Sequence, residues 1–101
     1  MNGKKETTKA PIKGYEEFYR YVRYPLITEK TLMLLEKQNK IVLIVDNTAN
    51  KTLIKQLIEK HLGLRVKKVN TLITPTLEKK AIVTFFTKDD ATKAATVLGI
   101  I

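Results

Sequence analysis

Lysine recurs beside small polar side chains at several points of this chain. The pattern occurs in four places: Asn39-Lys40, Asn50-Lys51, Lys67-Lys68 followed by Asn70-Thr71, and Lys79-Lys80. Ammonium groups bind phosphate oxygens, and amide or hydroxyl groups reach phosphates and 2′-hydroxyls. At the ends of helices and strands, such side chains favour recognition of a folded RNA by its shape. A solvated lysine face is the alternative for any single position.

Residues suited to catalysis or metal binding are scarce. The chain has no cysteine and a single histidine, His61, so it offers neither a thiolate site nor an imidazole cluster. Its glycines, at positions 3, 14, 63 and 99, stand singly and form no phosphate-binding loop. No nucleophile is paired with an oriented base. We therefore expect no enzyme, no metal and no cofactor, and we assign His61 to the dipole at the end of a helix.

The net charge points to a polyanionic partner. Lys and Arg number 19 against 10 Asp and Glu, which leaves +9 over 101 residues. This is the electrostatic footprint of a phosphate-binding protein, although charge also serves solubility. No segment approaches the roughly 18 apolar residues that span a bilayer, and the first residues lack the apolar region of a secretory signal. The sequence predicts a cytoplasmic protein without membrane insertion.

The chain divides into a basic N-terminal extension, residues 1–23, and one domain, residues 24–101. Near the end of the extension, aromatic residues alternate with arginines. There Phe18, Tyr21 and Val22 have helical spacing and could cover the domain, whereas the same rings could stack on unpaired bases. The sequence leaves both interpretations open.

Local patterns predict the elements of the domain. Thr28 is a suitable N-cap for a helix over residues 28–37, and the β-branched run 41–45 is typical of a central strand covered on both faces. An amphipathic helix follows and ends at Gly63. Residues 65–74 and 78–87 form a predicted β-hairpin, and a last helix begins near Asp89 and Asp90, taken as its cap, and ends at Gly99.

Together these elements predict an α/β (α+β) sandwich. Its sheet is mainly antiparallel, has three to four strands and carries helices packed on it in a single small domain. We expect Ile100 and Ile101 to pack back onto the body. An RNA-recognition-motif domain is disfavoured, because the aromatics of the strands are confined to Phe85 and Phe86 at the end of the last one.

Several segments of the domain occur in the order and at the spacing of one known family. They are residues 24–30 (Tyr-Pro-Leu-Ile-Thr-Glu-Lys), Asn39-Lys40 before the strand ending at Val45-Asp46, Ala49-Asn50-Lys51 with Ile54-Lys55, residues 66–72 (Val-Lys-Lys-Val-Asn-Thr-Leu) and residues 79–81 (Lys-Lys-Ala). By these segments, residues 22–99 resemble the universal large-subunit ribosomal protein 23 family. The resemblance implies a structural protein bound to domain III of large-subunit (23S-type) rRNA beside the mouth of the polypeptide exit tunnel. It adds Lys30 and Lys55 to the predicted rRNA contacts.

The resemblance also implies protein partners. Members of the family lie beside neighbouring ribosomal proteins at the exit tunnel and dock the signal recognition particle, translocation channels or nascent-chain chaperones. In bacterial members, a glutamate of the Pro-x-x-Ser-Glu-Lys segment contacts the chaperone trigger factor, and this position falls on Glu29. A carboxylate at a helix start also suits the helix dipole, so Glu29 has a structural explanation as well.

Two features depart from the family's pattern. Bacterial members have a long finger that reaches into the tunnel, whereas the connection at residues 74–77 is too short for one and resembles that of archaeal members. The N-terminal extension is longer than in many archaeal members and its contacts cannot be inferred by matching, so only its charge predicts rRNA contact. A free-standing basic RNA-binding or protein-interaction module remains the alternative. Cosedimentation with large subunits after a high-salt wash distinguishes it from a ribosomal protein.

Overall fold

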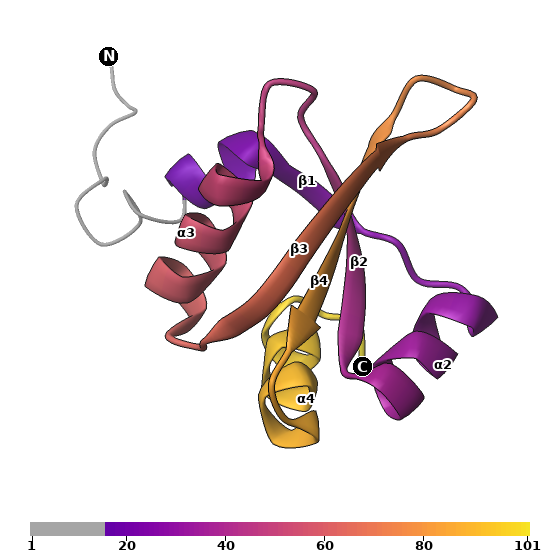
Figure 1. The fold of residues 1–101 in the computed structure, drawn as a ribbon, viewed down its shortest axis with the longest axis vertical. Coiled ribbons are helices and arrows are strands. Elements are labelled where there is room, and N and C mark those ends of the chain that lie inside the picture. The colour runs from indigo at the N-terminus through magenta and orange to yellow at the C-terminus, as the bar shows by residue number, and fades with distance from the viewer. Residues whose placement is uncertain (1–15) are drawn as a thin grey trace, which may run out of the picture.

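A short helix, a four-stranded sheet and three longer helices make up residues 16–101, the part of the chain that the computed structural model describes (Figure 1). Residues 16–21 are helical and lead directly into the first strand. The later elements are β1 (Val22–Pro25), α2 (Glu29–Gln38), β2 (Lys40–Val45), α3 (Lys51–Leu62), β3 (Val66–Ile73), β4 (Lys79–Phe85) and α4 (Lys88–Val97). The predicted α+β class with an antiparallel sheet is confirmed.

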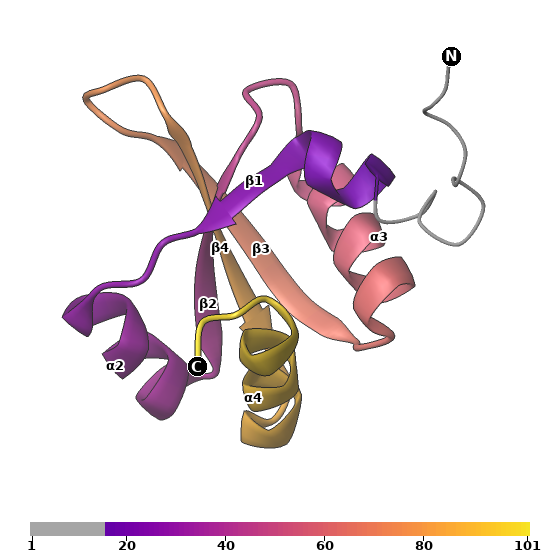
Figure 2. The same cartoon turned by 180° about the vertical axis from the view of Figure 1, so that it is seen from behind.

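The sheet places β2 in its interior. The strand order is β1-β2-β4-β3, and every neighbouring pair is antiparallel. Helix α3 lies on one side of the strands and α2 on the other, as the two opposite views show (Figures 1 and 2). Ile41 and Leu43 belong to the main core, and Val42 and Ile44, which point the other way, are also buried. Both faces of β2 are therefore covered, as its β-branched sequence predicted.

The main core lies between the sheet and helices α3 and α4. Helix α3 contributes Ile54 and Ile58, and α4 contributes only alanines, whose small side chains let it approach the sheet closely. Phe18 and Val22 belong to the same core, each 1% exposed. The packed part of the chain thus begins before residue 24, and Phe18 and Val22 cover the domain. The basic positions within residues 1–15 lie outside the described residues.

Capping residues set the helix ends. Thr28 caps α2 in a reciprocal box with Thr31, and Gly63 ends α3 with a φ of 68° in the left-handed region, both as predicted. The predicted cap of α4 was wrong. Its N-cap is Thr87, whose hydroxyl accepts a hydrogen bond from the Asp90 amide at 3.1 Å. Because Thr87 is the last extended residue, the two aspartates are already in the first helical turn.

The end of the chain only partly follows the prediction. The Ile100 amide donates a hydrogen bond to the Ala95 carbonyl at 2.8 Å, and its side chain packs against the core. Ile101 does not pack back onto the body, and this residue is 62% exposed. Gly99, with a φ of 78°, makes the turn that returns one residue to the core and leaves the next in solvent.

Candidate nucleic-acid interface

Strand register brings lysines from three strands onto one side of the sheet. Thr84 of β4 is paired with Lys40 of β2 and with Lys68 of β3, so these three side chains form a row across the strands. Two residues along, Ile82 is paired with Val42 and Asn70, and then Lys80 with Ile44 and Leu72. Alternate residues of a strand share a face. We call Lys40, Lys68, Asn70 and Lys80 the basic sheet face.

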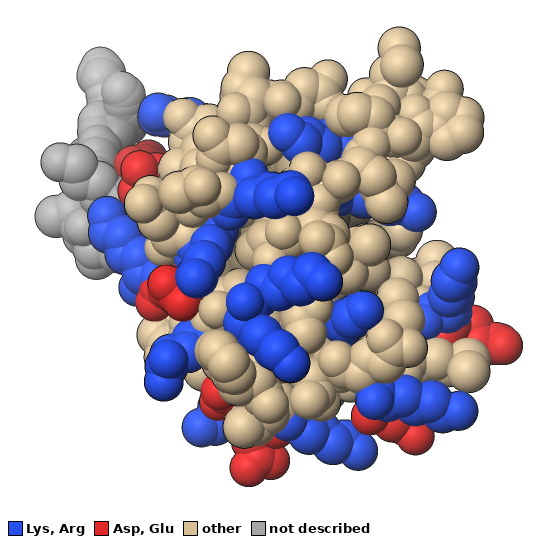
Figure 3. Space-filling model, in the orientation of Figure 1, with Lys and Arg blue, Asp and Glu red and all other residues tan. Residues whose placement is uncertain are grey.

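This face points away from α3. Its neighbours Val42 and Ile44 lie opposite the core residues Ile41 and Leu43, which face α3. Lys68 is exposed, whereas Lys40, Asn70 and Lys80 are half-buried. Half-buried lysines typically lay their aliphatic stems on apolar surface and keep the ammonium group in water. In Figure 3, lysines and arginines gather over the middle of the molecule and most carboxylates lie toward its edges. The arrangement suits a polyanion laid across the strands.

Thr84 is a candidate that sequence reasoning missed. Its Oγ1 atom is buried and has no hydrogen-bond partner within residues 16–101, although lysines are paired with it on both sides. A buried hydroxyl is normally satisfied, so this one stands out between two cations, but its burial keeps it from direct contact with a ligand on the surface. No local signal in the sequence distinguishes Thr84, because its position depends on the register of three strands.

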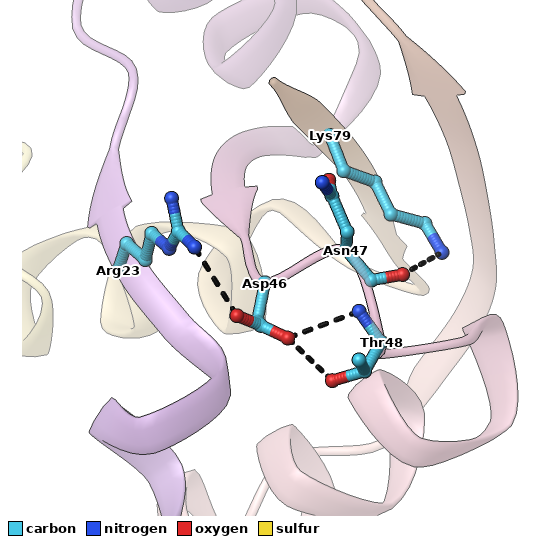
Figure 4. A network of polar contacts seen from close by, with 5 residues as sticks. All are labelled: Arg23, Asp46, Asn47, Thr48 and Lys79. Carbon is cyan, nitrogen blue, oxygen red and sulfur yellow. Dashed lines mark hydrogen bonds and ion pairs between the residues drawn. The ribbon is translucent and has the colours of Figure 1, made fainter. Parts of the chain in front are cut away.

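A second group of predicted residues lies on the other side of the sheet, around the start of α3. Lys79 is paired with the core residue Val45, and its Nζ atom donates to the Asn47 carbonyl at 3.5 Å (Figure 4). The Asn50 side chain accepts from the Leu53 amide at 2.8 Å and so caps α3. Lys51 and Lys55 follow on the exposed side of this helix. We call Asn50, Lys51, Lys55 and Lys79 the α3-start group.

Four predicted residues join neither group. Lys30 is exposed in the first turn of α2. Asn39 adopts the left-handed conformation that ends α2, with a φ of 58°, and its carbonyl accepts from the Phe85 amide at 2.9 Å. This geometry explains an asparagine there without a ligand. Lys67 is exposed at the irregularity between Val66 and Lys68, and Thr71 is half-buried opposite the core residue Ala81.

An ion pair and hydrogen bonds to Asp46 fix the loop that follows β2. Asp46 accepts from the Arg23 guanidinium at 3.1 Å, and its other oxygen accepts from the amide and hydroxyl of Thr48 (Figure 4). The Thr48 donors first, and then Arg23, lower the pKa of the Asp46 carboxyl. Across the sheet, a hydrogen bond to Glu78 at 2.9 Å raises the pKa of the Tyr24 hydroxyl. Both interactions attach β1 to later parts of the chain.

The lowered pKa of Asp46 predicts an acid-dependent stability. Its folded pKa lies below the unfolded value of about 3.9, so its contribution is fully present above about pH 4 and disappears as the pH falls through the folded pKa. Asp46→Asn should therefore flatten the decline in unfolding free energy over this acid range. Urea denaturation at a series of pH values measures it. An unchanged decline in the variant would contradict the assignment.

Helix α2 presents an exposed stripe with mixed character. Glu29, Leu32, Met33 and Glu36 follow one another at i, i+3, i+4 and i+7, which places them on one side of a helix. Leu32 and Met33 are exposed, and Glu29 lies in the first turn, where its charge suits the helix dipole. The sequence singled out Glu29 alone. We call these four residues the α2 stripe.

Comparison with known proteins decides the family. Residues 20–98 match the model of the family described as Ribosomal protein L23. The chain belongs to this family. The resemblance found in the sequence is thereby confirmed. No helix within residues 16–101 is long and apolar enough to cross a membrane.

Two curated relatives extend the match. The chain is 38% identical over 98 residues to the "Large ribosomal subunit protein uL23" of Trypanosoma brucei brucei, covering 97% of this chain and 60% of the relative. It is 39% identical over 92 residues to the "Large ribosomal subunit protein uL23A" of Caenorhabditis elegans, covering 91% and 63%. The chain thus spans about three fifths of the relatives' length. Both relatives are named as proteins of the large ribosomal subunit.

Proposed function

We propose that this L23-family chain is a structural constituent of the cytoplasmic large ribosomal subunit and binds large-subunit rRNA through the basic sheet face. The observation that carries the proposal is the register that places Lys40, Lys68 and Lys80 on one side of the sheet. The names of the two relatives support the same assembly. Binding to domain III beside the exit tunnel is proposed on the family resemblance.

The sheet makes this face a rigid platform. Its central strands β2 and β4 are hydrogen-bonded on both edges, so the lysine stems start from fixed positions. Lysine ammonium groups neutralise phosphates and release their counterions, while Asn70 offers hydrogen bonds to phosphates or 2′-hydroxyls. Such contacts recognise the spacing of phosphates in a folded RNA rather than the sequence of its bases. The face accordingly suits a fixed site within a large folded RNA.

The α3-start group provides a second rRNA contact. It lies on the opposite side of the sheet from the basic sheet face, as the pairing of Lys79 with Val45 shows. One continuous RNA helix cannot cover both sides of the domain. The two groups therefore bind separate RNA segments, between which the domain is held. Lys30, Asn39, Lys67 and Thr71 remain additional predicted contacts.

Salt resistance tests the assembly. A structural constituent fixed by two RNA contacts should remain with large subunits pelleted through about 0.5 M salt, because contacts on both sides must break together. A free-standing module bound by one basic surface should be released by the same wash, since phosphate binding weakens steeply with salt. Quantifying the chain in pellet and supernatant distinguishes them. Complete release would overturn the ribosomal assignment.

The α2 stripe is a candidate docking surface for exit-site factors. It combines two exposed apolar side chains with two carboxylates, so it is negatively charged whereas the basic sheet face is positively charged. Exposed apolar residues with a charged rim are typical of protein interfaces. The family resemblance supports this, because members dock nascent-chain factors and the glutamate that contacts such a factor in bacterial members corresponds to Glu29. We propose that Glu29 and Met33 contribute to this docking.

Substitution on the stripe tests docking separately from rRNA binding. Glu29→Lys with Met33→Lys should reduce recovery of purified signal recognition particle on large subunits about 10-fold, the range expected when central interface contacts are lost. The variant should still assemble. Val97→Lys, at an exposed apolar position of α4, is the matched control. Equal recovery by all three proteins would remove the stripe from the docking surface.

A further inference from the structure

Between α2 and the basic sheet face lies a recess of about 290 Å³. Its apolar lining comes from Leu34 of α2, Leu26 before it, and three sheet residues, Val42, Leu72 and Ile82. Lys30 and Lys80 also line it, whereas no carboxylate does among the described residues. Figure 3 shows the surface hollowed on the right of the view, between the sheet and α2.

We propose that this recess receives the base of one unpaired rRNA nucleotide, whose phosphates lie against Lys30 and Lys80. The inference deepens the proposed rRNA binding and rests on it. Unpaired nucleotides splay their bases out of folded RNA, and proteins hold such bases between apolar or aromatic side chains. Within the described residues, the middle of the sheet has no exposed aromatic side chains on which a base could stack. The aliphatic side chains that line the recess provide an apolar surface instead.

The size of the recess fits a single base. At about 290 Å³ it lies near the lower end of small-ligand pockets, which begin at about 300 Å³. A nucleic-acid helix is too wide to enter, so RNA can occupy the recess only through a single extruded group. Leu72 is 45% exposed although it lies on a strand next to this recess. An inserted base would cover that apolar surface.

The charges favour a nucleotide over a protein side chain. Two cations line the recess, and the row of Lys40 and Lys68 continues the positive charge along the same face. A nucleotide brings a flat apolar base together with negative phosphates, which complements both features. A leucine or phenylalanine from a neighbouring protein would fill the apolar part and leave the two lysines without a counter-charge.

Filling the recess tests the proposal. In Leu34→Trp the indole should occupy the space that the base would take, whereas Met33→Trp adds the same group to the exposed α2 stripe. Each purified full-length variant is bound to a large-subunit rRNA transcript. Dimethyl sulfate and carbodiimide then report accessible bases, and hydroxyl radicals report the protected backbone. Leu72→Glu, at an exposed position, places a carboxylate beside the same recess and is a second variant less prone to disturb folding.

The expected result is specific to one nucleotide. Wild type and Met33→Trp should protect a single unpaired base that regains reactivity with Leu34→Trp and Leu72→Glu, while backbone protection elsewhere persists. Affinity should fall about 10-fold, in the range of one lost base-stacking contact. Identical base patterns for all four proteins, with intact backbone protection, would overturn the inference and leave the recess to a protein segment. Absence of any backbone protection by wild type would instead refute the proposed rRNA binding, and the inference with it.

Discussion

Replacing Lys40, Lys68 and Lys80 together with glutamine should weaken binding to large-subunit rRNA by about 100-fold near 0.15 M salt. Each lysine that neutralises a phosphate contributes about 0.7 to 0.9 to the slope of log affinity against log salt. Losing three should make that slope less negative by about 2 to 3. Glutamine preserves much of the side chain, so the sheet should remain folded. Filter binding or fluorescence anisotropy over a salt series measures both quantities.

The matched control removes the same charge from the other side of the sheet. Lys60 belongs to α3, and Lys88 and Lys93 belong to α4, and both helices pack on the core opposite the basic sheet face. If binding depends on that face, Lys60→Gln/Lys88→Gln/Lys93→Gln should lower affinity far less. Equal losses in the two triple variants would contradict a special role of the basic sheet face, because binding would then follow total charge or the side of the sheet that carries the α3-start group.

Phe18→Ala should lower the free energy of unfolding by about 3 to 4 kcal/mol, as removal of a buried phenylalanine commonly does. Phe18 is 1% exposed, and its ring makes a T-shaped contact with His61, with ring centroids 5.8 Å apart. Beside it, a Glu17 carboxylate oxygen lies 3.5 Å from the Lys60 Nζ atom. The short helix thus docks on α3 mainly through the aromatic ring, because the ion pair is exposed and weak.

Urea denaturation with a control from the same helix measures this contribution. Arg20→Ala removes an exposed side chain from the same short helix and should change stability by no more than about 0.5 kcal/mol. A loss of about 3 kcal/mol is a large part of the 5 to 15 kcal/mol typical of a domain. If both variants changed stability equally little, residues 16–21 would not contribute to the domain, which would then begin with β1 at Val22.

Strong local signals explain why most of the fold was predictable. The β-branched run in β2, the apolar spacing of α3 and the glycine after it each specify an element without reference to distant residues. The sequence did not single out β1, because Val22–Pro25 is short, ends in proline and contains one fully buried residue. Its place in the sheet depends on pairing with β2, which is a long-range interaction. Thr87 was overlooked as a cap because two aspartates follow it closely.

The candidate interface was predictable only as a set of residue types. Lysines beside asparagines could be found from the sequence, but their division into the basic sheet face and the α3-start group depends on strand register. Register also places Thr84 between Lys40 and Lys68, residues far from it along the chain. The recess beside α2 requires the helix, the preceding loop and two strands together with β2, so no single segment encodes it.

Chemical footprinting of large-subunit rRNA tests the central claim most directly. The purified chain is titrated onto the transcript at several salt concentrations, beside the Lys40→Gln/Lys68→Gln/Lys80→Gln variant. Our account predicts protection confined to domain III, persisting for wild type as salt rises and lost first in the variant. Diffuse protection across the rRNA, disappearing equally for both proteins as salt rises, would contradict it.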